Sequence, residues 1–200
     1  MIKRILITLL VFHLLAIFQS CCVNEFKFRW DDFDIDILDN SGKIPIITEE
    51  TNLNKNALGF RISMKILPEG MPMPSIVSFP KIKFISECYA TSCDNKWIKQ
   101  HYLIEIQVIT LNDYSDNYPA NSDITELFKA RKSDETKSDY TSLDNIISII
   151  NEQDDTYGGW KFDLFLMDKD AHSGEHIFEI RLKFSDDIEM IKQTATLNLY

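Results

Sequence analysis

The segment Leu58–Ile66, LGFRISMKI, carries the clearest fold signal in the sequence. Its apolar side chains recur at every second position, and glycine, arginine, serine and lysine fill the positions between them. A period of two is typical of a β-strand that buries one face and exposes the other. We therefore predict a half-buried strand here, and we expect Pro68 to end it because proline cannot donate a ladder hydrogen bond.

The same kind of pattern recurs on both sides of this segment. It predicts further strands over residues 26–30, 33–37, 76–87, 97–111, 162–166, 178–184 and 194–199. The strands at 162–166 and 178–184 are expected to form a hairpin around a turn at 168–174.

Helical signals are fewer. Apolar residues at helical spacing predict a helix over 143–150, with Thr141 or Ser142 as its N-cap. A second, short helix is expected near 123–128, and the charged stretch 131–142 is expected to be an exposed insertion. This element order predicts a mainly β protein, an antiparallel β-sandwich of immunoglobulin-like or related type with one or two short helices.

The N-terminus has the pattern of a secretory leader. Lys3 and Arg4 precede a nearly continuous apolar run, Ile5–Phe18, which at about 14 residues has the length of a signal-peptide core. A membrane-spanning helix needs roughly 20 apolar residues, so we interpret residues 1–20 as a cleaved signal peptide.

The end of this leader, Phe18-Gln19-Ser20-Cys21, resembles a bacterial lipobox. The resemblance implies that Cys21 carries lipid, including palmitate, and that the chain is membrane-anchored. Residues 21–25 would be the lipidated N-terminus and a short tether, and residues 26–200 a single domain. The alternative is an ordinary secreted or periplasmic protein cleaved near Ser20.

Composition limits the partners. The 200-residue chain carries a formal net charge of −10, which argues against nucleic acid because nucleic-acid binding needs a basic surface. In an exported protein, Cys88 and Cys93 are the natural disulfide pair. No cofactor motif is present: there is no Gly-x-Ser-x-Gly elbow and no phosphate-binding Gly-x-x-x-x-Gly-Lys loop.

One turn is dense in potential metal ligands. Its candidate ligands for calcium or zinc are Asp168, Asp170, His172, Glu175 and His176. The turn has neither the glycine of an EF-hand loop nor the helical context of a zinc protease motif. A polar turn is the plainer interpretation.

Three further groups of residues each allow a functional and a structural interpretation. Asp113, Asp116, Asn117 and Asp123 form an oxygen-rich loop that would suit calcium or simple turn chemistry. Asp31, Asp32, Asp34 and Asp36 invite comparison with the paired carboxylates of glycosidases, although a solvated acidic face is the plainer interpretation. Trp30, Trp97 and Trp160 could stack on a sugar or pack in the core.

Several local patterns resemble a family of Bacteroidetes-type lipoproteins of similar length without an assigned activity. They are the doubled cysteine after the lipobox, Leu38-Asp39-Asn40-Ser41, Asn56-Ala57-Leu58-Gly59 and the loop from Asn112 to Asp123. The resemblance implies an envelope lipoprotein, at the outer membrane, and supplies no catalytic or binding residues.

These observations favour a non-enzymatic, lipid-anchored envelope domain without a cofactor. Its expected role is to bind a glycan or an envelope protein, or to act as a scaffold. The alternatives are a calcium- or zinc-dependent site in the Asp168–His176 turn and a glycan-binding module.

Overall fold

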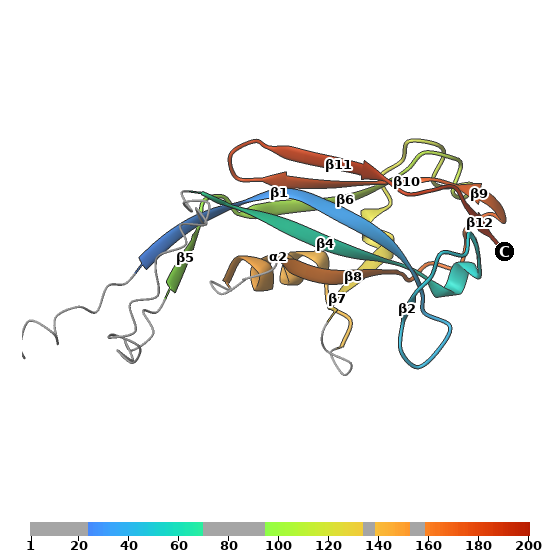
Figure 1. Cartoon of the computed structure of the whole chain (residues 1–200). Helices are drawn as coiled ribbons and strands as arrows, with labels where there is room; N and C mark the ends of the chain where they lie inside the picture. Colours follow the sequence, from blue (N-terminus) through green and yellow to red (C-terminus); the bar gives the residue numbers. More distant parts are fainter. Residues whose placement is uncertain (1–23, 70–94, 134–138, 153–158) are drawn as a thin grey trace, which may run out of the picture.

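The computed structural model describes residues 24–69, 95–133, 139–152 and 159–200 (Figure 1). Within these residues the chain is mainly β with one α-helix, which confirms the predicted class. The predicted strand at 76–87 lies outside the described residues, as do Cys21, Cys88 and Cys93.

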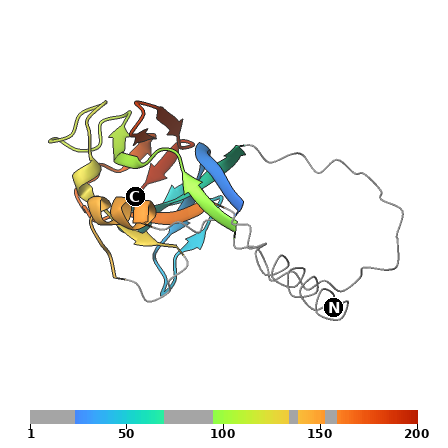
Figure 2. The same ribbon diagram turned by 90° about the vertical axis from the view of Figure 1, so that its left-hand side faces the viewer.

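The largest sheet has six strands in the order β2-β1-β4-β8-β7, with β5 beside the first part of β1. Its strands are β1 (Asn24–Asp39), β2 (Ile46–Ile47), β4 (Leu58–Glu69), β5 (Asn95–Lys99), β7 (Phe128–Lys132) and β8 (Trp160–Leu166). Both Figure 1 and Figure 2 show β5 alongside β1, and this pair is parallel.

Two three-stranded sheets complete the fold. One has the order β11-β10-β6 and the other the order β3-β12-β9. Their strands are β3 (Asn52–Leu53), β6 (Leu103–Thr110), β9 (Gly174–His176), β10 (Phe178–Phe184), β11 (Glu189–Gln193) and β12 (Leu197–Leu199). Of these pairs only β3 with β12 is parallel. Two 3₁₀-helices, η1 (Lys55–Ala57) and η2 (Thr125–Leu127), lie in the connections.

The two strands predicted at 26–30 and 33–37 are one strand, β1. Its register with β4 shifts between Trp30 and Asp32. Trp30 and Phe33 are both buried, although residues three apart in a regular strand point to opposite faces. The shift is a β-bulge that returns both side chains to the core, which is why the apolar alternation breaks at this point.

The prediction that Pro68 ends β4 is wrong, because this strand continues to Glu69. Pro68 lies inside β4, opposite Phe28 of β1. β8 pairs with β4 only from Gly59 to Met64, so Pro68 lies beyond β8. There a proline can sit in a strand, because its missing N–H can face the unpaired side.

The predicted hairpin of 162–166 with 178–184 is wrong. β8 pairs with β4 and β7, whereas β10 pairs with β6 and β11. Side chains of β8 are buried on both faces of its sheet, so its apolar pattern does not indicate which strands pair with its edges. β11, which the sequence did not indicate, is the hairpin partner of β10.

Two other segments are divided differently from the prediction. The strand expected over 97–111 is split into β5 and β6, which belong to different sheets. The exposed insertion expected over 131–142 begins inside β7, and Thr141 pairs with Ala130 of that strand. The segment before η2 is a loop, as predicted. The closing strand expected over 194–199 is present as the shorter β12.

The core lies between the six-stranded sheet and the β11-β10-β6 sheet. The ring of Phe60 on β4 lies 5.8 Å from that of Phe128 on β7 and 5.4 Å from that of Phe178 on β10. Buried residues of all three sheets join one hydrophobic cluster.

Helix α2 (Leu143–Glu152) packs beside β6 and β7 and contributes Ile146 and Ile150 to this cluster (Figure 2). Ser142 Oγ accepts a hydrogen bond from Asn145 N at 3.2 Å, so the predicted N-cap is confirmed. At the other end, the Lys99 ammonium donates to the carbonyls of Ile150 and Asn151. This places a cation at the negative end of the helix dipole. Among the described residues no helix combines the length and the apolar character needed to cross a membrane.

Candidate functional site

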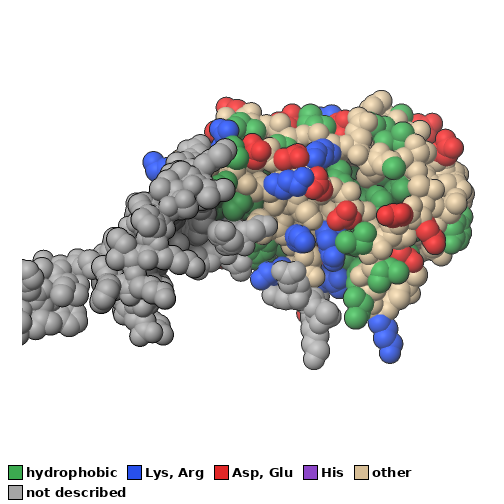
Figure 3. Space-filling model, viewed as in Figure 1, with side chains coloured by type: hydrophobic (Ala, Val, Ile, Leu, Met, Phe, Trp, Pro, Cys, Tyr) green, Lys and Arg blue, Asp and Glu red, His purple; other side chains and the backbone are tan. Residues whose placement is uncertain are grey.

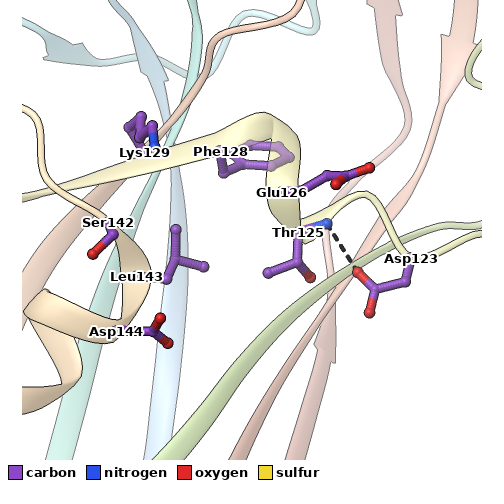
Figure 4. A pocket seen from close by; sticks show the side chains of 8 residues that line it. All are labelled: Asp123, Thr125, Glu126, Phe128, Lys129, Ser142, Leu143 and Asp144. Carbon is purple, nitrogen blue, oxygen red and sulfur yellow. Dashed lines mark hydrogen bonds between the residues drawn. The ribbon is translucent and has the colours of Figure 1, made fainter.

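A cleft of about 510 Å³ lies between η2 and the first turn of α2 (Figure 4). It is lined by Asp123, Thr125, Glu126, Phe128, Lys129, Ser142, Leu143 and Asp144. Phe128 is buried, whereas the acidic side chains are exposed. The cleft therefore has an apolar base and a polar, solvated rim.

Local turn chemistry fixes the η2 side of this cleft. Asp123 Oδ1 accepts from the Thr125 N–H at 2.9 Å, drawn in Figure 4. Thr125 Oγ1 accepts from the Val108 N–H of β6 at 2.8 Å. The Tyr118 hydroxyl donates to Glu126 Oε1 at 2.6 Å, and this hydrogen bond raises the pKa of Tyr118 above its usual range.

The charge in the cleft is mostly negative. Figure 4 shows the carboxylates of Asp123, from the loop before η2, and of Asp144, from the first turn of α2, at this space. Glu126 adds a third carboxylate, and Lys129 is the single cation of the lining. The cleft therefore suits a ligand that offers hydroxyl or ammonium donors.

The side chains of the Asp168–His176 turn have separate surroundings. His176 is buried, and its Nε2 lies 2.8 Å from the carbonyl oxygen of His172. His172 Nε2 lies 3.3 Å from Asp116 Oδ1. Asp168 accepts from the Lys169 N–H, and Asp170 and Glu175 are exposed. In the part of the chain that the structure describes, no group of three or more His, Cys, Asp or Glu side chains is arranged to hold a metal ion.

A tyrosine lies beneath this turn. The Tyr114 side chain is completely buried and its ring packs 6.0 Å from that of His176. Burial, followed by the negative charge of Asp168, raises the pKa of Tyr114 far above its usual range. Tyr114 therefore stays neutral and belongs to the core under the turn.

The oxygen-rich loop before η2 uses its acids for turns. Asp113 Oδ1 accepts from the Ala120 N–H at 2.8 Å, and Asp123 caps Thr125 as described. Asp116 is 97% exposed. Only Asp123 of this group reaches the cleft.

Two of the tryptophans and two of the acids considered in the sequence, Asp32 and Asp34, can now be placed. Trp30 and Trp160 are buried, so neither offers a face to a sugar, and the Trp97 side chain lies outside the described part. Asp32 lies 2.8 Å from Lys192 Nζ and Asp34 lies 2.6 Å from Lys65 Nζ. Hydrogen bonds from Lys192 and from Lys65 lower the pKa of Asp32 and of Asp34, respectively. These acids are ion-pair partners at neutral pH.

Beside the bulge of β1, a histidine and an aspartate pair without forming a catalytic triad. His101 Nδ1 lies 3.2 Å from Asp186 Oδ2, and His101 Nε2 accepts from the Trp30 N–H at 3.0 Å. In a triad, Nε2 faces the nucleophilic hydroxyl. Here a backbone N–H occupies that nitrogen, so the pair connects the β1 bulge to the turn between β10 and β11.

The face of the large sheet that points away from the core holds a buried carboxylate. Asp163 on β8 is fully buried and accepts from Arg61 Nε at 2.8 Å and from Arg61 Nη2 at 3.0 Å. Arg131 on β7 lies farther away, with Nη2 3.6 Å from Asp163 Oδ2. Sequence reasoning missed this network. The signal was Asp163 itself, a single acid inside the otherwise apolar run 162–166. A buried acid needs a buried partner.

The comparisons with known proteins identify a family. No curated protein and no solved structure matches the chain. A family model described as a domain of unknown function, DUF5034, matches residues 31–196. That range begins within β1 and ends just before β12, so it includes the cleft, the Asp163 network and most of the core. The chain therefore belongs to the DUF5034 family.

Proposed function

We propose that this protein is a non-enzymatic, lipid-anchored component of the bacterial cell envelope whose β-rich domain binds a ligand or a partner. The leader and Cys21 support an anchor of the Bacteroidetes lipoprotein type, at the outer membrane. A secreted or periplasmic form is the alternative. The six-stranded sheet and the β11-β10-β6 sheet, with the core between them, would be the layers of a β-sandwich.

The cleft between η2 and α2 is the observation that supports binding. It supplies three carboxylates, of which Asp123 and Glu126 each have one oxygen engaged within the protein, together with an apolar base and one cation. Glycan hydroxyls and ammonium groups are donors that match these acceptors. A glycan or an amine-bearing envelope partner is therefore the proposed ligand class.

Two features favour binding over catalysis at this place. General acid catalysis by a carboxyl group depends on desolvation of that group, and the three carboxylates of the cleft are exposed. The His101–Asp186 pair, in which only the histidine is buried, lies elsewhere, and Nε2 of His101 is occupied by the Trp30 N–H. The lining also contains no histidine or cysteine.

The anchor is tested by mass spectrometry of protein extracted from membranes of the native host. We expect the mature chain to begin at Cys21 and to carry acyl chains, and Cys21→Ala should release the protein into the soluble fraction. An unmodified Cys21 in the membrane extract would contradict the anchor and leave the binding proposal intact.

The cleft is tested with a glycan array and with spermidine as a cationic probe, followed by titration of ¹⁵N-labelled protein. The double substitution Glu126→Gln and Asp144→Asn should weaken binding of any hit at least about tenfold, because two charge-assisted contacts are lost. Glu189→Gln, an exposed acid on β11, is the matched control and should bind normally. Hydrolysis of an arrayed glycan that the double variant abolishes would replace the binding role with an enzymatic one.

A further inference from the structure

Arg131 is a mostly buried cation whose hydrogen-bonding groups are largely unused. Its side chain is 12% exposed, and its buried Nε has no hydrogen-bond partner. Among the described residues its one charged contact is Asp163, at 3.6 Å. Buried polar groups in native proteins are almost always paired, and an exception needs an explanation such as an ion.

Asp163 cannot supply that missing partner. Both of its oxygens already accept from Arg61, at 2.8 and 3.0 Å. One carboxylate therefore faces two guanidinium groups, and its two short hydrogen bonds both come from Arg61, which leaves Arg131 with a contact of 3.6 Å. Leaving a charge unpaired in a low-dielectric region is costly, so an additional anion would be stabilised at this position.

The surroundings hold the Arg131 guanidinium in a fixed orientation. Its central carbon lies 5.0 Å from the ring centre of Phe165 and 6.0 Å from that of Tyr140. The two rings contact one another at 5.2 Å, and the Tyr140 hydroxyl accepts from the Asn40 amide at 3.1 Å. A guanidinium ordered in this way loses little entropy when it binds a planar oxyanion.

The charge around this position is favourable as well. On a chain with net charge −10, Lys and Arg side chains gather over β4, β8 and β7 on the face drawn in Figure 3. Lys161 on the neighbouring strand β8 is exposed and would attract an anion without desolvation. Asp163 is the one acid of β8 itself, and Arg61 already neutralises it.

We propose that Arg131 is the centre of an oxyanion-binding site on the outer face of the large sheet, and that its ligand is a phosphate or carboxylate group. The guanidinium fork binds two oxygens of such a group bidentately. The site is independent of the proposed function, because Arg131 does not line the cleft between η2 and α2. The oxyanion can belong to a free metabolite or to a lipid headgroup, and the experiment separates these sources.

Inorganic phosphate is the first probe, compared with sodium chloride at equal ionic strength. At tenfold excess over Kd, phosphate should raise the Tm of the full-length wild-type protein by about 3–6 °C. The Arg131 Nε–H resonance in a ¹H–¹⁵N spectrum should shift on the same titration. No rise beyond that in chloride, or an unmoved Nε–H resonance, would overturn the site.

Arg131→Gln should abolish the phosphate response, and Lys183→Gln, which removes an exposed cation on β10 of another sheet, is the matched control that should retain it. Arg131→Lys keeps the charge without the fork, so its response should fall. If Arg131→Gln does not fold, Arg131→Lys alone decides: a response equal to that of the wild type would contradict the proposal. An equal response in all variants would mean non-specific screening and would also contradict it.

The last comparison identifies the source. Acetate and glycerol 3-phosphate are titrated as free ligands, and sedimentation is measured with vesicles of phosphatidylglycerol and of phosphatidylcholine. Arg131-dependent sedimentation with phosphatidylglycerol alone assigns the site to a lipid headgroup. A response to the free anions without sedimentation assigns it to a soluble ligand.

Discussion

Two ion-pair networks lie on the same outer face of the large sheet, and they differ in burial. The Asp163 network joins β4, β7 and β8, with Asp163 fully buried and Arg61 20% exposed. The second network joins β1, β4 and β11 through Asp32, Asp34, Lys65 and Lys192, whose side chains are between 35% and 52% exposed. Both networks pair aspartates with basic side chains, arginines in the first and lysines in the second. We expect solvent access, more than the number of contacts, to set how much each network contributes to folding.

The largest effect is expected at Asp163. Asp163→Asn removes the negative charge but keeps the size of the side chain, so Arg61 and Arg131 are left buried without an anion. We expect a loss of about 3–5 kcal/mol in the free energy of unfolding, measured by urea denaturation.

Asp34→Asn is the control on the same face and should cost less than about 1 kcal/mol, because its partner is exposed. Equal losses for the two variants would break the distinction between the networks.

The second prediction concerns the two arginines that share Asp163. Arg61→Gln removes both short hydrogen bonds to a buried carboxylate and should cost about 3 kcal/mol. Arg131→Gln loses a 3.6 Å contact and its ring packing, and should cost about 1–2 kcal/mol. Urea midpoints of the two variants give the order, and the reverse order would show that Arg131 is the main partner of Asp163.

The third prediction is that salt affects the stability contributions of the two networks differently. Lys192 connects β11 to Asp32 and Asp34 of β1, and Lys192→Ala should cost about 1 kcal/mol or less at low ionic strength. At 1 M sodium chloride, where the screening length is about 3 Å, this cost should nearly vanish. The cost of Asp163→Asn should persist at high salt. A Lys192→Ala effect that is independent of salt would indicate lost packing over Phe33, which lies 5.6 Å from the ammonium.

The smallest effect is a dependence on acid. The hydrogen bonds from Lys192 and Lys65 lower the folded-state pKa of Asp32 and Asp34 below the ordinary value of 3.8. The stabilisation is therefore complete above that value and is lost as pH falls through the lowered pKa. We expect the Tm difference between wild type and the double variant Asp32→Asn, Asp34→Asn to be constant from pH 7 to 5 and to close below pH 3.8. A difference that grows on acidification would have the wrong sign for this linkage.

The sequence predicted those elements whose burial follows a simple period. β4 and β10 alternate cleanly because each buries one face, and α2 shows helical spacing behind its Ser142 cap. β8 was recognised as a strand, but its partners were not, since strands buried on both faces carry no information about their neighbours. The bulge at Trp30 concealed the continuity of β1, because one extra residue inverts the alternation.

The candidate sites were harder to predict for a physical reason. The cleft brings together Asp123 and Asp144. In the sequence η2 and β7 lie between these two residues, so no local motif connects them. The Asp163 network depends on the register of β4, β7 and β8, which period-two patterns leave undetermined. By contrast, the turn at 168–176 was conspicuous because its ligand-type residues are adjacent in sequence, yet His172 and His176 have separate partners.

The position of β1 in the sheet has a mechanical consequence. β1 is an interior strand, paired with β4 along most of its length and flanked on its other edge by β5 at its start and β2 at its end. A pull on the chain at residue 24, along the strand axis, would load these ladders in shear, so that many hydrogen bonds resist at once. An edge strand pulled sideways would instead open one bond at a time. A domain held from its N-terminus through such a strand resists unfolding under drag or stretch far better than its free energy of unfolding alone would suggest.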